Sequence, residues 1–192
     1  MAVGVHLGAT MQVSWRWAAR PSRAQSVPTD ICISLVDSLY KDHRSLFIGS
    51  FAASMSALIS AWKTGEPLLY LCSLSLVVVA IARMIDCHAY SAQRAELKTS
   101  AGARKWERRY VVGAACYVAL LGIWCLVSFS KTADPFVQLL SFSMTLAYLI
   151  GVSGRNFASR PLVTSQIVCA GLPMGTALLA MGNAYYSIFA FV

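Results

Sequence analysis

Residues 110–129, YVVGAACYVALLGIWCLVSF, decide the fold of this chain. This stretch carries no charged side chain, and its length matches the roughly 20 helical residues that cross a hydrocarbon core of about 30 Å. The basic and aromatic segment KWERR, at 105–109, precedes it, as is common where a transmembrane helix meets the membrane surface. The stretch therefore predicts one transmembrane helix.

The rest of the chain repeats this pattern. Hydrophobic residues make up 57% of the sequence and charged residues 12%, against roughly 25% charged residues in a typical soluble domain. Long apolar runs alternate with short polar stretches, which predicts an all-α, polytopic transmembrane helical bundle. The five full spans are expected at about 46–62, 68–85, 110–129, 136–152 and 162–181.

A sixth apolar run, at 185–192, is too short to cross a bilayer, because eight helical residues rise only about 12 Å. Either the chain ends in a stub or it is a fragment of a longer protein, and we favour the fragment. Residues 1–29 are expected to form a disordered tail, and residues 30–192 the transmembrane module. Within the module, apolar and polar residues interleave at 30–44, which predicts a short amphipathic helix at the membrane surface.

Lys and Arg are distributed unevenly between the two sides of this topology. Fourteen lie on the side of the N-terminus, and only Lys63 and Lys131 lie on the other side. Positive loops face the cytoplasm, so the N-terminus is expected to be cytoplasmic. Because the net charge of +8 sits in segments that flank apolar runs, it predicts contact with the lipid bilayer and not with nucleic acid. Arg83, near the end of the second span, is expected to extend towards the surface.

The segment 86–109 reads as the longest polar loop and holds most of the candidate side chains. Asp86 and His88 fit either a metal or proton-sensing site or a solvated pair. Trp106, Arg108 and Arg109 fit an anchored helix start, in which Glu107 pairs with one of the arginines.

The remaining candidates lie at or within the later spans. Asp134 and Pro135 fit the first turn of the fourth span, and Gln138 is expected to face another helix. Gly151 is expected to end that span, and Arg155 with Asn156 could contact a lipid phosphate. Pro173 is expected to kink the fifth span, with Gly171 and Gly175 permitting close packing, so that it is a candidate for transmitting a signal.

No catalytic residue, cofactor or metal site is predicted. The six cysteines form no CxxC pair, the three histidines lie outside the spans, and no carboxylate lies within a span. The chain also lacks a Walker loop, an HExxH motif and a GxSxG motif.

Five strings, taken in order, resemble the N-terminal membrane region of bacterial cyclic di-GMP signalling proteins. They are DSLYKDHRSL at 37–46, WERRYVVG at 106–113, DPFVQLLSF at 134–142, GVSGRNFAS at 151–159 and CAGLP at 169–173. In that family a multi-helix membrane module precedes a PAS domain and then GGDEF and often EAL domains, which make and hydrolyse cyclic di-GMP. Neither a GGDEF nor an EAL sequence occurs here, so the chain as given is not expected to be an enzyme.

The resemblance implies a membrane anchor and signal-input module in a bacterial inner membrane, whose partners are the cytoplasmic PAS, GGDEF and EAL domains of a parent protein. Homodimerisation stays open. The alternative is a stand-alone small membrane protein that acts as a scaffold or as a subunit of a complex. A transporter half fits less well, because the spans lack charged residues near their centres and no inverted repeat is evident.

Overall fold

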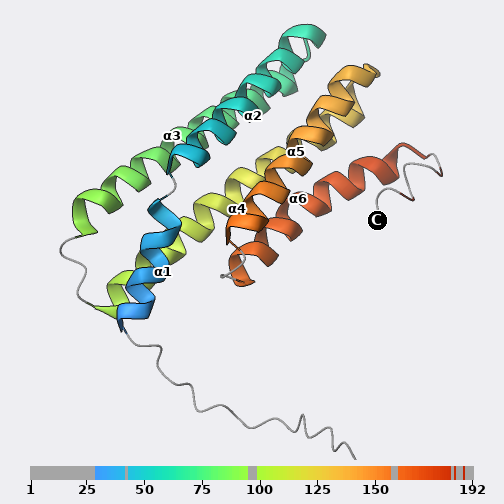
Figure 1. Cartoon of the computed structure of the whole chain (residues 1–192). Helices are drawn as coiled ribbons and strands as arrows, with labels where there is room; N and C mark the ends of the chain where they lie inside the picture. The colour runs from blue at the N-terminus through green and yellow to red at the C-terminus, as the bar shows by residue number, and fades with distance from the viewer. Residues whose placement is uncertain are drawn as a thin grey trace, which may run out of the picture.

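The computed structural model describes residues 29–41, 43–94, 99–156, 160–182, 184 and 188. Within these ranges every element is a helix (Figure 1). The six helices are α1 (Thr29–Lys41), α2 (His43–Thr64), α3 (Pro67–Gln93), α4 (Ser100–Lys131), α5 (Pro135–Asn156) and α6 (Arg160–Ala180).

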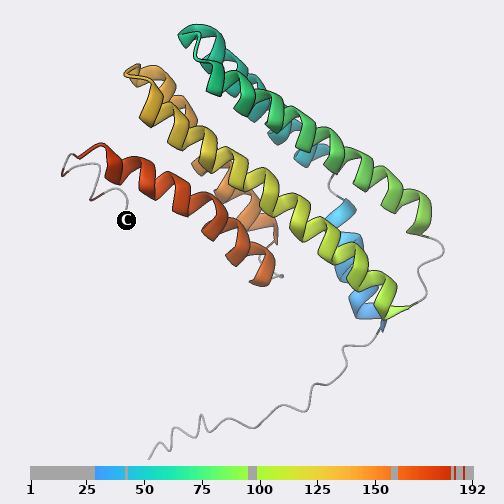
Figure 2. The same ribbon diagram turned by 180° about the vertical axis from the view of Figure 1, so that it is seen from behind.

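Helices α2 to α6 are each long and apolar enough to cross a membrane, which confirms the predicted all-α polytopic bundle. Helix α4 is the central element and packs against α1, α3, α5 and α6. Figure 2 shows α4 running between α3 and α6 along most of the bundle. We call the end at which α1 lies, α3 ends and α4 begins the α1 end of the bundle.

Local sequence explains the helix boundaries at the opposite end. Gly65 adopts a φ of 69°, which glycine tolerates, and Pro67 then begins α3 at a position where its missing N–H is not needed. The carboxylate of Asp134 accepts hydrogen bonds from the backbone N–H groups of Phe136 (2.9 Å) and Val137 (3.4 Å). Asp134 and Pro135 thus begin α5 as the sequence predicted.

The core of the bundle is built around one face of α4. Its buried positions recur every three or four residues, as expected for one helical face: Ala103, Trp106, Tyr110, Ala114, Tyr117, Leu121 and Trp124. Helix α2, which packs against α3 and α5, contributes the small buried side chains of Ala53, Ala57 and Ala61 to the same core cluster. Many large apolar side chains point outwards instead, including Leu74, Val78 and Ile85 of α3, as suits helices that face lipid.

The predicted polar loop at 86–109 is largely helical. Helix α3 continues to Gln93 and α4 begins at Ser100, with the Thr99 side chain accepting a hydrogen bond from the Gly102 backbone N–H (3.3 Å). Hydropathy alone misses such helical ends, because they are polar on most faces. Similarly, α5 does not end at Gly151 but continues to Asn156.

The short helix predicted at 30–44 is present as α1, and it packs against other helices. It ends at Lys41, and its buried side chains Val36, Leu39 and Tyr40 join a core cluster that includes residues of α3 and α4. Its apolar face is therefore covered by protein. Figure 1 shows α1 alongside the first part of α4. The predicted partial span at 185–192 lies almost entirely outside the described residues, as does the predicted tail up to residue 28.

Helix α6 contains Pro173. The glycine that allows a neighbouring helix to pack closely beside this proline is Gly122 of α4, and not Gly171 or Gly175. A Cβ atom added at Gly122 of α4 would lie 2.9 Å from the Ala170 carbonyl oxygen and 3.2 Å from Pro173 Cγ. A Cβ at Gly171 or at Gly175 would meet no atom within 4 Å. The prediction that Gly171 and Gly175 permit the close approach is therefore wrong, because both lie away from α4.

Candidate functional site

Four aromatic rings join α1 to α3 and α4, and we call them the four-ring cluster: Tyr40, Tyr90, Trp106 and Tyr110. The rings of Tyr40 and Tyr90 stack with centroids 4.1 Å apart and an interplanar angle of 14°. Trp106 and Tyr110 meet the Tyr40 ring edge-on, with centroid distances of 6.0 and 5.1 Å. The Tyr40 hydroxyl also donates a hydrogen bond to the Trp106 carbonyl (3.1 Å). Aromatic pairs in such geometries contribute beyond their buried area.

A polar contact borders the four-ring cluster. The Arg94 guanidinium donates two hydrogen bonds to the Asp37 carboxylate (2.9 and 2.7 Å), and the Tyr90 hydroxyl donates a third (2.5 Å). The hydrogen bonds from Arg94 hold the pKa of Asp37 below its ordinary value, because they favour the charged carboxylate. Burial raises the pKa of Tyr40, so this hydroxyl stays protonated as a donor. Aromatic contacts and an ion pair thus both attach α1 to the rest of the bundle.

Asp86 makes a second ion pair between α3 and α4. Its carboxylate lies 2.8 Å from the Arg109 guanidinium, which is also over the Trp106 ring at 4.9 Å from the centroid. His88 does not join this pair. Residues two apart on a helix point in roughly opposite directions, and His88 lines an apolar groove with residues of α2 such as Phe47. Asp86 and His88 therefore do not share the site that the metal or proton-sensing interpretation requires.

Arg83 is buried in the bundle and does not extend to the surface as expected. Only 6% of it is exposed. Its guanidinium donates a hydrogen bond to the Tyr148 hydroxyl of α5 (3.0 Å) and lies over the rings of Tyr110 and Tyr117 at 5.7 and 5.6 Å. A cation within a span is expensive unless it is well surrounded, and here three aromatic side chains surround it. Arg83 thereby connects α3, α4 and α5 next to the four-ring cluster.

The other predicted side chains do not gather at this site. Asp134 lies at the opposite end, where its ion pair with Lys63 (2.6 Å) lowers the pKa of Asp134. Gln138 is buried, and its amide donates to the carbonyl of Thr132 (2.8 Å), just before its own helix. Pro173 packs against α4 in the middle of α6.

Three further predicted residues lie at the α1 end. Glu107 is half-buried, and the predicted pair with an arginine is not found among the residues that the structure describes. Arg155 and Asn156 form the last turn of α5, and their side chains lie outside the described part of the chain. Their predicted contact with a lipid phosphate stays a prediction.

Sequence reasoning missed Tyr40, Tyr90, Arg94 and the burial of Arg83. Had 86–94 been read as helix, Arg83, Cys87, Tyr90 and Arg94 would have fallen on one face at spacings of three and four. Gln166 of α6 was missed as well, although it is 1% exposed.

The contacts at the α1 end join α1 to α3 and α4. Two ion pairs, Asp37 with Arg94 and Asp86 with Arg109, and the ring contacts of Tyr40, Tyr90 and Tyr110 lie at this end. In the described ranges no three His, Cys, Asp or Glu side chains come close enough to hold a metal ion. The geometry instead joins a helix outside the apolar spans to the ends of two spans. Comparisons with protein-family models, with curated proteins and with solved structures give no match.

Proposed function

We propose that this chain is the membrane anchor and signal-input module of a cyclic di-GMP enzyme whose catalytic domains lie outside the given sequence. The observation that carries the proposal is the docking of α1 on α3 and α4 through the four-ring cluster. A helix fixed in this way must follow any movement of the two spans. Such an attachment suits a protein that passes changes in its membrane part to domains in the cytoplasm.

The resemblance to the membrane regions of cyclic di-GMP signalling proteins gains support from the positions of its strings. The string at 37–46 contributes Tyr40, and the string at 106–113 contributes Trp106 and Tyr110. These residues are more than 60 positions apart, yet they contact one another. Two of the strings thus meet in one tertiary contact of the bundle.

The proposed orientation puts the α1 end in the cytoplasm of a bacterium, at the inner membrane. The excess of Lys and Arg at this end supports the proposed orientation. Arg83 is buried, but the excess remains when Arg83 is left out of the count. Reporter fusions at Gly102 should behave as cytoplasmic, and fusions at Gly65 and Ala133 as periplasmic. A periplasmic signal at Gly102 would overturn the orientation.

The gene beyond codon 192 tests the function itself. An open reading frame that continues into a diguanylate cyclase or phosphodiesterase domain is the expected result. A stop codon directly after Val192, together with a membrane product of this length in the native cells, would contradict the proposal and favour the stand-alone scaffold or complex subunit.

A further inference from the structure

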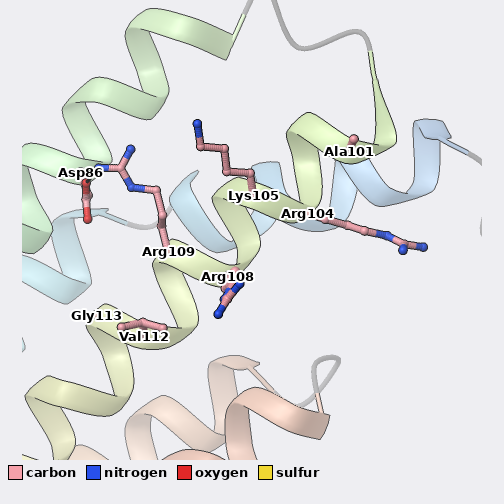
Figure 3. A pocket seen from close by; sticks show the side chains of 8 residues that line it. All are labelled: Asp86, Ala101, Arg104, Lys105, Arg108, Arg109, Val112 and Gly113. Carbon is pink, nitrogen blue, oxygen red and sulfur yellow. Dashed lines mark hydrogen bonds and ion pairs between the residues drawn. The ribbon is translucent and has the colours of Figure 1, made fainter.

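Helix α4 presents a second, open face at the α1 end. Trp106 and Tyr110 point into the four-ring cluster, whereas another set of residues on α4 lines a shallow groove of about 640 Å³ bordered by Asp86 of α3 (Figure 3). The groove is lined by Arg104, Lys105, Arg108, Arg109, Val112 and Gly113.

The groove carries positive charge that no acidic side chain in the described ranges fully neutralises. Arg109 is paired with Asp86, and Figure 3 shows its side chain directed at that carboxylate. Arg104, Lys105 and Arg108 are exposed, and none of them forms an ion pair with a residue in the described ranges. Arg104 and Arg108 are four positions apart on the helix, a spacing at which like charges destabilise it slightly, and Figure 3 shows the side chains of Arg104, Lys105 and Arg108 extending in different directions.

The polarity of the groove changes along the helix axis. Arg104 and Val112 are eight residues apart, which corresponds to about 12 Å of helix. Val112 is 54% exposed and stands near the beginning of the apolar run at 110–129. A ligand that fills this groove needs an anionic group at the cations and an apolar portion one to two turns further into the span. A free phosphate offers only the first, whereas an anionic phospholipid offers both.

We propose that this groove binds an anionic phospholipid, with its phosphate at Arg104, Lys105 and Arg108 and the start of its acyl chains against Val112 and Gly113. Clusters of Lys and Arg beside a span attract anionic headgroups, and guanidinium groups bind phosphate oxygens in bidentate fashion. Arg109, held by Asp86 and the Trp106 ring, forms the border of the site towards α3. This inference is independent of the cyclic di-GMP proposal and stands if that proposal fails.

Native mass spectrometry of the purified chain in mild detergent tests the site. The chain is titrated with phosphatidylglycerol, with phosphatidylcholine, and with phosphatidylglycerol in the presence of excess inorganic phosphate. The double variant Arg104→Gln, Arg108→Gln removes two groove charges. The matched control, Lys41→Gln with Arg44→Gln, removes two exposed charges at the same end of the bundle but outside the groove.

The wild-type chain should retain phosphatidylglycerol about tenfold more tightly than phosphatidylcholine, and excess inorganic phosphate should displace little of it. The groove variant should lose about tenfold in this affinity, with an unchanged melting curve, while the control variant stays close to wild type. Equal retention of the two lipids would overturn the site, as would an equal loss in both double variants. Complete displacement by inorganic phosphate would assign the groove to a free anion.

Discussion

At the scale of single residues, Arg83 combines features that rarely occur together. It is a cation inside an apolar span, its hydrogen-bond acceptor is the neutral hydroxyl of Tyr148, and the rings of Tyr110 and Tyr117 lie beside its guanidinium. The sequence located this arginine near the end of a span, but the direction of its side chain depends on Tyr110, Tyr117 and Tyr148, which come 27 to 65 positions later. Local sequence could not predict this contact.

Removing only the hydroxyl of Tyr148 should destabilise the bundle. Tyr148→Phe keeps the ring but leaves the buried guanidinium without the only acceptor that it has among the described residues, which is expected to cost about 1–3 kcal/mol in free energy of unfolding. The measurement is unfolding of the purified protein in a denaturing-detergent titration. Tyr70→Phe is the control, because Tyr70 lies exposed on α3.

Combining Tyr148→Phe with Arg83→Met should recover part of the lost stability, because no buried charge is then left without a partner. If Tyr148→Phe unfolds at the same point as wild type and as Tyr70→Phe, Arg83 is not held as described.

Asp37 makes the contact of α1 dependent on pH. Its folded-state pKa is below the ordinary value of 3.8, so its contribution to stability is fully present above that value and is lost as the pH falls through the lowered pKa. Asp37→Asn removes this contribution at every pH. The melting temperature of wild type should therefore exceed that of Asp37→Asn at neutral pH, and the difference should shrink below about pH 4. A difference that stays constant down to pH 2 would exclude this role for the carboxylate.

At the scale of helices, α4 holds the bundle together, since it contacts α1 at one end and α6 near its middle. The crossing with α6 depends on Gly122, and no local pattern in the sequence favours this glycine over Gly171 or Gly175. Which glycine meets a neighbouring helix follows from the rotation of each helix about its axis. That rotation is fixed by packing over the whole length, including the contact of Pro173 with Gly122.

Gly122→Ala should destabilise the crossing of α4 and α6. The new methyl group would lie 2.9 Å from a backbone oxygen and 3.0 Å from a Cα atom of Ala170, so the helices must separate, at a cost of about 1–3 kcal/mol. Gly171→Ala is the matched control: it meets open space and should be neutral or slightly stabilising, because alanine favours helix. The same unfolding titration measures both. Equal effects of the two substitutions would contradict the described crossing.

At the scale of the whole molecule, the sequence predicted the class of fold and the number of long apolar helices. Both follow from the length and spacing of uncharged runs, which the bilayer thickness constrains strongly. It did not predict that α3 and α4 continue as helices at the α1 end, or that α1 packs there against them. Those features depend on contacts between Tyr40, Tyr90 and Trp106. The segments around these residues are polar, so their low hydropathy predicted a loop.

The central claim is that the docking of α1 controls an attached enzyme, and charge exchange at the Asp37–Arg94 pair tests it most directly. The chain is fused after Val192 to a diguanylate cyclase domain, and cyclic di-GMP is measured in cells at matched membrane abundance. The variants are Asp37→Arg, Arg94→Asp and both together, with Arg44→Asp as a control for the change in charge.

Each single exchange should shift cyclic di-GMP in the same direction by about two- to fivefold, the range expected when a partly exposed ion pair biases a two-state equilibrium. The double exchange restores opposite charges and should return the level towards that of wild type, and Arg44→Asp should leave it unchanged. Equal cyclic di-GMP in all of these proteins at equal abundance would contradict the claim that α1 transmits a signal from the bundle.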